Sequence, residues 1–182
     1  MTFLPVIVQL LLLVVVAVAG FYDLRFRRIP NWLALIGLVV GIGLNSFLFE
    51  WAGFQRALLG MGLALLVYFP LYLLRAMGAG DAKLMAAVGS MLGPGNWLAV
   101  FVLTSVLGGL VALIVLLFAG RVRKAFWNVG WIMNEVIHLR APYHSSEELD
   151  VRSPRAMRMP HGVMIALGSA AFLAVRAMMG SK

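Results

Sequence analysis

Long uncharged stretches alternate along the chain with short segments that hold the charged or turn-forming residues. The first stretch, residues 3–21, contains 19 residues without a charge. A helix of about 20 apolar residues spans the hydrocarbon core of a bilayer. No Lys or Arg precedes this stretch, and its apolar core is too long for a secretory signal peptide. We therefore predict a retained transmembrane helix over residues 3–22.

Five further stretches of the same kind follow. Pro30 suits the first turn of a helix and disfavours helical backbone before it, so a second helix is predicted to begin there. Residues 84–120 are uncharged but too long for one crossing. Gly93-Pro94-Gly95-Asn96 divides them, because Gly and Pro favour turns. The additional predicted helices cover residues 31–49, 56–75, 80–92, 97–119 and 160–180.

The segment 120–159 has a different pattern. Apolar residues recur at helical spacing between residues 121 and 140, cations occur near both ends, and Trp127 and Trp131 lie one turn apart. This pattern indicates a helix along the membrane surface. The sequence thus predicts an all-α polytopic membrane protein with one membrane-embedded domain over residues 1–182. It has six transmembrane helices and a cytoplasmic amphipathic segment before the last helix.

Composition supports a membrane protein and excludes two other classes. Hydrophobic residues make up 63% of the chain and charged residues 12%, which is far from the balance of a water-soluble globule. Disordered chains are poor in apolar residues, so disorder is excluded as well. Cysteine is absent, which excludes disulfides and thiolate metal ligands, and the three histidines are too scattered for a metal-site spacing.

The net charge of +8 is distributed unevenly. If residues 22–31, 75–83 and 120–159 face the cytoplasm, they contain 12 of the 15 Lys and Arg residues. Cytoplasmic loops of membrane proteins carry an excess of Lys and Arg. The expected orientation therefore places both ends of the chain on the outer face. The positive charge is explained without a nucleic-acid partner.

Two acids lie where predicted helices meet the cytoplasmic interface. Asp23 closes the first helix, and Asp81 opens the fourth within Gly78-Ala79-Gly80-Asp81. They are either interfacial residues paired with nearby cations or functional residues, since acids at membrane depth are costly. Two acids at the same depth can share a proton and activate water for peptide hydrolysis. The flanking glycines would let an extended substrate approach.

Helix dipoles suggest different roles for the two acids. Asp81 lies at a predicted helix N-terminus, where negative charge is favoured, and Lys83 adds to this effect. Asp23 lies at a predicted C-terminus, where negative charge is disfavoured. We therefore expect Asp81 to be the ionised member of the pair and Asp23 to hold the proton.

Three motifs together resemble the prepilin peptidase family of bacterial membranes, the Gly-x-Gly-Asp class of aspartic proteases. They are the block from Asp23 through Arg25 to Ile29-Pro30-Asn31, the block Gly78–Leu84, and the block Pro160–Ala166. The resemblance implies that Asp23 and Asp81 are catalytic. It also implies residues that bind substrate or shape the site: Arg25, Gly78, Gly80, Lys83, Pro160, His161 and Gly162. His161 stands where the family usually has an aromatic residue.

The chain resembles the short members of that family. Long members also methylate the new N-terminus with an extra domain, often rich in cysteine, between the first two helices. Here only about ten residues separate those helices. The resemblance is therefore to the peptidases of Flp/Tad-type pili, with archaeal preflagellin peptidases as neighbours. It implies cleavage of a basic leader from prepilins or pseudopilins at the cytoplasmic face of the bacterial inner membrane, next to pilus assembly machinery, without cofactor or metal.

One related protease class is set aside, and two other classes remain as alternatives. Presenilin-type proteases also have a Tyr-Asp, as in Tyr22-Asp23, but they are longer and carry Pro-Ala-Leu near the site. A proton-coupled transporter or channel could use the two acids as a relay, although transport favours acids near the bilayer midplane and inverted repeats. A non-catalytic anchor of a pilus or secretion machine would have no need for the glycines beside Asp81.

Overall fold

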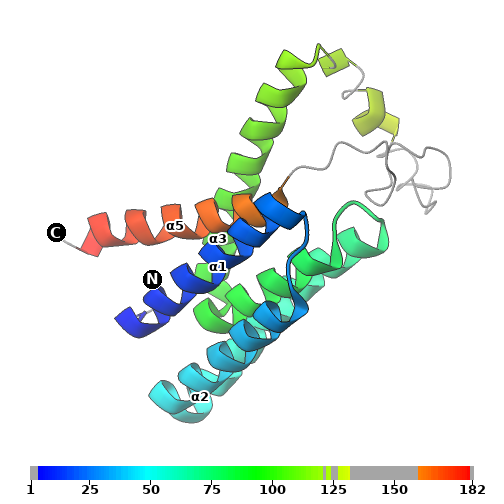
Figure 1. Cartoon of the computed structure of the whole chain (residues 1–182). Helices are drawn as coiled ribbons and strands as arrows, with labels where there is room; N and C mark the ends of the chain where they lie inside the picture. Colours follow the sequence, from blue (N-terminus) through cyan, green and yellow to red (C-terminus); the bar gives the residue numbers. More distant parts are fainter. Residues whose placement is uncertain (1–3, 121, 124–126, 132–159, 181–182) are drawn as a thin grey trace.

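The fold is built from four helices in the computed structural model, which describes residues 4–120, 122–123, 127–131 and 160–180. Figure 1 shows α1 (Val6–Phe26), α2 (Asn31–Leu73), α3 (Ala79–Phe118) and α5 (His161–Gly180). Each is long and apolar enough to cross a membrane. No strand occurs among the residues that are described. The prediction of an all-α membrane protein is confirmed.

Helix α1 continues one turn beyond its predicted end at residue 22. Nothing between Tyr22 and Phe26 breaks a helix, and the chain leaves helical geometry only at Arg27. Arg27 has the left-handed backbone angles φ 54° and ψ 32°, and its N–H donates to the Asp23 carbonyl at 3.0 Å. Asp23 therefore lies in the last turn of α1, in keeping with its expected place at the end of the first helix.

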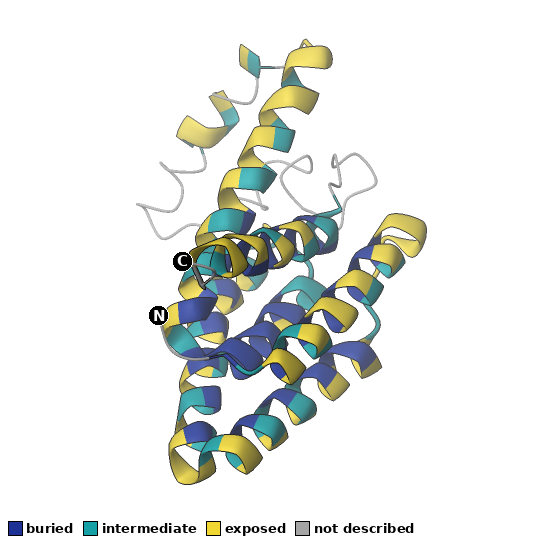
Figure 2. Ribbon diagram, turned by 90° about the vertical axis from the view of Figure 1, so that its left-hand side faces the viewer, coloured by how far each residue is buried: buried dark blue, intermediate teal, exposed yellow. Residues whose placement is uncertain are grey.

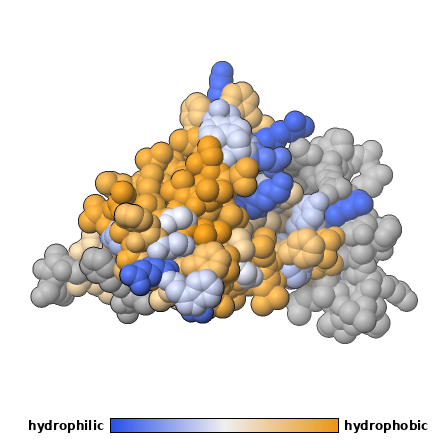
Figure 3. Space-filling model, turned by 90° about the horizontal axis from the view of Figure 1, so that it is seen from below, coloured by the Kyte–Doolittle hydropathy of each residue, from blue (hydrophilic) through white to orange (hydrophobic). Residues whose placement is uncertain are grey.

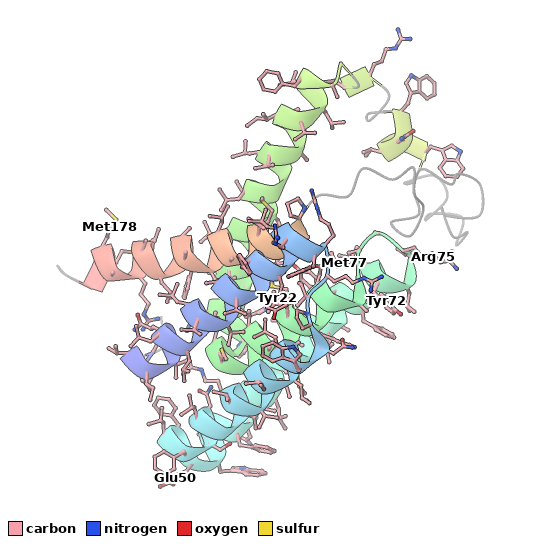
Figure 4. All side chains as sticks on the ribbon, viewed as in Figure 1. Tyr22, Glu50, Tyr72, Arg75, Met77 and Met178 are labelled. Atoms are coloured by element: carbon pink, nitrogen blue, oxygen red, sulfur yellow. The ribbon has the colours of Figure 1, made fainter. Side chains whose placement is uncertain are left out.

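Helix α2 contains a sharp break where a loop was predicted. We expected separate helices at 31–49 and 56–75, but helical geometry is lost only at Phe49 and Glu50 and resumes at once. The φ of Glu50 is positive, at 53°. Figure 4 shows Glu50 at one tip of the structure, far from Tyr72 and Arg75, so the chain reverses direction at this break. The loop 50–55 that we predicted is absent.

The break in α3 is also shorter than predicted. Among the four residues Gly93 to Asn96, only Gly93 leaves helical geometry, with φ 73° and ψ 172°. Pro94 begins the next helical segment, because a residue in the first turn needs no N–H for an intrahelical bond. Figure 1 shows α3 changing direction after its first segment and projecting away from the other helices.

The first segment of α3 forms the centre of the structure. Every residue from Leu84 to Gly93 is buried. Gly60 of α2 and Gly89 of α3 touch through their backbones, and a methyl group on either would collide with the carbonyl of the other. Asn45 of α2 donates to the Ser90 and Met91 carbonyls at 3.0 and 3.1 Å. Both halves of α2 thus pack against this segment, while α5 contacts α1 and α3.

The outer surface is largely apolar. Figure 2 shows buried residues where the helices pack together and exposed residues along the projecting part of α3. Large side chains such as Phe47, Leu66 and Phe118 are exposed. Figure 3 shows apolar residues over much of the face seen from below. Together with the four helices that are long and apolar enough to cross a membrane, this exposed apolar surface supports a membrane protein.

The predicted cytoplasmic amphipathic segment lies mostly outside the described residues. Within its described part, Trp127 is exposed and Trp131 is half-buried. Its position relative to a membrane stays a prediction, as do the single domain over residues 1–182 and the number of six crossings.

Candidate active site

Asp23 is buried at the junction of two helices. It lies in the last turn of α1 and is only 8% exposed. Its Oδ2 accepts the backbone N–H of Gly162, in the first turn of α5, at 2.8 Å. The first N–H groups of a helix have no intrahelical partner, and they form the positive end of the helix dipole. Asp23 therefore caps a helix other than its own.

Asp81 lies in the first turn of α3, where its half-buried side chain folds back on the chain. Its Oδ2 accepts the N–H of Gly78 at 3.3 Å. Gly78 precedes the helix with an extended backbone. Both acids thus lie at helix N-termini, Asp81 at its own and Asp23 at that of α5. The dipole argument, which assigned the negative charge to Asp81 and the proton to Asp23, no longer separates them.

One cavity brings the two acids together. It has a volume of about 270 Å³. Its lining consists of Asp23, Arg27, Arg28, Ile29, Gly78, Ala79, Gly80 and Asp81. We call it the dyad cavity. The two carboxylates are close enough for their charges to interact. The end of α1, the chain that follows it and the beginning of α3 therefore form one site.

Two glycines of the site pack closely against other segments of the chain. A methyl group on Gly80 would lie 3.1 Å from the Cβ of Ile29. A methyl group on Gly162 would lie 3.1 Å from both the Ile29 Cδ1 and the Asp23 Oδ2. Ile29 thus occupies the direction in which a side chain at Gly80 would point, while Gly78 and Gly80 also line the dyad cavity. The approach of an extended substrate to these glycines stays a prediction. Gly80 and Gly162 let the protein's own segments meet around the dyad cavity.

Five predicted site residues lie outside the lining of the dyad cavity: Arg25, Lys83, Pro160, His161 and Gly162. Lys83 donates to the Asn31 Oδ1 at 2.9 Å and so links the beginnings of α2 and α3. It also lines a second cavity of about 350 Å³ with mainly apolar side chains, among them Leu35 and Leu65. Arg25 is exposed on α1 and is absent from the lining of the dyad cavity. That Lys83 and Arg25 bind substrate or shape the site stays a prediction.

The block around residue 160 behaves as the first turn of α5. Pro160 precedes the helix, and its carbonyl accepts the N–H of Val163 at 3.2 Å. The ring of His161 lies 6.3 Å from that of Tyr68, centroid to centroid. Tyr68 in turn contacts Trp97 at 6.3 Å and Phe101 at 6.0 Å. His161 thus packs with aromatic rings, in keeping with the aromatic residue expected at its position.

Sequence reasoning missed several residues of the site. Arg27 and Arg28 follow Asp23 closely, but the excess of Lys and Arg in cytoplasmic loops already explained their presence. Ile29 was only part of a motif, and its contacts with Gly80 and Gly162 depend on how three segments meet. Tyr68 is 2% exposed and is an ordinary core residue by pattern. Its spacing to His161 gives no sequence signal, because the two lie on different helices.

The chain matches a known family over most of this site. The sequence model of the type IV leader peptidase family matches residues 10–113. That range includes Asp23, Gly78, Gly80 and Asp81, and it ends before α5. Neither the curated proteins nor the solved structures include a match to the chain. The match covers more than half of the 182 residues, and the chain belongs to the type IV leader peptidase family.

Proposed function

We propose that this protein is a membrane aspartic endopeptidase that removes the basic leader from prepilins or pseudopilins. The observation that carries the proposal is the dyad cavity, in which Asp23 and Asp81 meet from segments far apart in the sequence. Two carboxyl groups that share one proton can act as an acid and a base together. Membership of a peptidase family supports hydrolysis as the reaction.

The proposed reaction needs only the two carboxyl groups and water. The ionised carboxylate takes a proton from water as the water oxygen attacks the scissile carbonyl carbon. The protonated carboxyl group donates a hydrogen bond to the carbonyl oxygen, which gains negative charge. When the C–N bond breaks, the leaving nitrogen takes a proton from the dyad. The products are a carboxylic acid and an amine, and the dyad again holds one proton.

The proposed topology has six crossings with the dyad cavity at the cytoplasmic face. As straight helices, α2 and α3 would be about 60 Å long, roughly twice the hydrocarbon thickness of a bilayer. The breaks at Glu50 and Gly93 divide each of them into two segments. The cations Arg27 and Arg28 lie at the dyad cavity, and Arg56 lies against the break at Gly93. This distribution supports a cytoplasmic dyad.

The substrate side of the proposal follows from the family and the charge pattern. We propose the bacterial inner membrane as the location, a prepilin or pseudopilin as substrate and pilus assembly machinery as the neighbour. No methyltransferase activity is expected. The transporter alternative is disfavoured, because Asp23 lies in the last turn of α1 and Asp81 in the first turn of α3, away from the middle of either helix.

The test is cleavage of a prepilin by the purified protein in detergent, where no compartments exist for transport. Asp23→Asn and Asp81→Asn should each lower the cleavage rate by about a thousandfold or more, and the double variant should be no worse. Glu50→Gln, at the break inside α2 and at the far tip of the structure, is the matched control and should cleave normally. A wild-type rate in either Asn variant would disprove the aspartic-protease mechanism.

A further inference from the structure

His161 lies near Asp23 but takes no part in the lining of the dyad cavity. It is the first residue of α5, and the N–H of the next residue, Gly162, donates to the Asp23 Oδ2 at 2.8 Å. The imidazole of His161 is close enough to the Asp23 carboxylate for their charges to interact. Asp23 therefore has a group near it, outside the cavity, that can carry a positive charge.

The packing of His161 accounts for its ring but not for its nitrogen atoms. The ring lies 6.3 Å from that of Tyr68, centroid to centroid, and Tyr68 is 2% exposed. The His161 Nε2 atom is buried and has no hydrogen-bond partner among the residues that the structure describes. A phenylalanine ring would pack against Tyr68 without burying an unpaired nitrogen, which is unfavourable. An imidazole at this position therefore needs an explanation other than packing.

The two acids of the dyad have unequal surroundings. The Asp23 Oδ2 accepts its backbone N–H at 2.8 Å, whereas the Asp81 Oδ2 accepts its own at 3.3 Å. Asp23 has the imidazole of His161 within range, while the group of α2 that interacts with Asp81 is the phenol of Tyr68, which carries no positive charge. A hydrogen bond and a nearby cation both favour an ionised carboxylate. The surroundings therefore favour the negative charge on Asp23 and the shared proton on Asp81.

We propose that His161 is a positioning residue that keeps the negative charge of the dyad on Asp23, by taking up a proton before the dyad takes its second one. This inference rests on the proposed function. Among the described residues, the titratable groups next to His161 are Asp23 from α1 and Tyr68 from α2, and Asp81 of α3 interacts with both of them. The positive end of α5 disfavours an imidazolium, so the imidazolium forms only against an ionised Asp23. In the reaction, Asp23 then takes the proton of water and Asp81 donates to the scissile carbonyl.

The experiment measures kcat/KM for prepilin cleavage against pH, in detergent, for the wild type, His161→Phe and His161→Gln. Both substitutions remove the titratable group, and Phe keeps a ring against Tyr68. An imidazolium opposes a second proton on the dyad, so the wild type should stay active at lower pH than either variant. In both variants the acidic limb of the profile should lie about one pH unit higher, as expected for the loss of one nearby charge.

His144→Phe is the matched control, because it makes the same substitution at a histidine of the predicted cytoplasmic segment. It should leave the acidic limb where it is in the wild type. A packing role alone would lower the rate of His161→Phe equally at every pH, without moving the limb. An acidic limb that stays in place in His161→Phe, or that moves equally in His144→Phe, would overturn the proposed role of His161.

A titration without substrate separates this inference from the proposed function. NMR of the full chain with ring-labelled histidine, in detergent, follows the titration of His161, whose signal is identified by its loss in His161→Phe. Coupling between two sites is reciprocal, so Asp23→Asn should move the His161 midpoint to lower pH by about one unit, and Glu50→Gln should not move it. Cleavage by the wild type with an unmoved midpoint would overturn this inference and leave the peptidase proposal standing. A moved midpoint without cleavage would leave the pairing of His161 with Asp23 standing and overturn the peptidase.

Discussion

At the scale of single residues, the site depends on one backbone hydrogen bond. The Gly162 N–H fixes the Asp23 carboxylate at 2.8 Å, while Ile29 fills the space beside Gly162 and Gly80. A hydrogen bond to a charged acceptor is stronger than one between neutral groups. Asp23 is therefore oriented by α5 as well as by its own helix. Small residues are required where these segments meet, since any side chain would push the acid away.

Gly162→Ala should weaken the site without removing a catalytic group. The added methyl would lie 3.1 Å from the Asp23 Oδ2 and from the Ile29 Cδ1, so the carboxylate must shift. We expect prepilin cleavage to fall roughly tenfold or more, because small displacements of catalytic groups are costly. Gly109→Ala is the control, since nothing lies within 4 Å of a methyl group there. Equal cleavage rates for the two variants would show that the Gly162 contact does not orient Asp23.

The two acids were predictable from sequence, but their surroundings were not. Asp23 and Asp81 stand out because charge is rare in this chain and each adjoins a turn motif. The Gly162 contact and the packing of His161 on Tyr68 bring together residues far apart in the chain. Arg27 was not singled out, because the excess of Lys and Arg in cytoplasmic loops already explained it. Lys83 was assigned to the dyad from its distance in sequence, although residues two apart on a helix face different sides.

At the scale of elements, the close packing of α2 on α3 holds the centre together. Gly60 and Gly89 meet backbone to backbone, and Asn45 bonds to the carbonyls next to the break in α3. Gly93 leaves the helix at this point, and Pro94 restarts it. The helices themselves were predictable from apolar stretches. We predicted longer loops at the two breaks. Charged and turn-forming residues indicate where a helix is interrupted, but they do not show that one or two residues are enough to interrupt it.

Gly60→Ala should destabilise the fold, whereas Gly62→Ala should not. A methyl group on Gly60 would collide with the Gly89 carbonyl, while a methyl group on Gly62 meets nothing within 4 Å. Overpacking of this kind costs about 1–3 kcal/mol. The free energy of unfolding in mixed micelles should fall by that amount for Gly60→Ala and stay within about 0.5 kcal/mol for Gly62→Ala. Equal losses in the two variants would contradict the tight crossing of α2 and α3.

At the scale of the whole molecule, the distribution of charges and the breaks in α2 and α3 favour the same arrangement of the chain in the membrane. The beginning of α1 and the end of α5 lie on the same side in Figure 1, as an even number of membrane crossings requires. The end of the helices that holds the dyad cavity also has three cations, Arg27, Arg28 and Lys83. Lys83 donates a hydrogen bond to Asn31 there. Glu50 lies at the opposite tip. The dyad is thus at one end of the helices rather than in the middle.

Reporter fusions test the proposed topology directly. Fusions after Arg28 and Met77 should report a cytoplasmic location, and fusions at Gly53 and Gly95 should report an external one, because cations are retained on the cytoplasmic side. The measurement is alkaline phosphatase activity, which requires export, with a cytoplasmically active reporter at the same positions as the control. An external location for Met77 together with a cytoplasmic one for Arg28 would place the two acids on opposite faces and contradict the peptidase proposal.

The bond between Asp23 and Gly162 also sets an order of events during biosynthesis. Asp23 leaves the ribosome with α1, whereas Gly162 comes with α5, the last of the four described helices. Until α5 inserts, Asp23 lacks the group that holds it in place. The candidate site is therefore incomplete in the newly made chain while it is being inserted. If the chain is the proposed peptidase, we expect its activity to begin only when the α5 segment docks, so a nascent chain should not cut neighbouring membrane proteins.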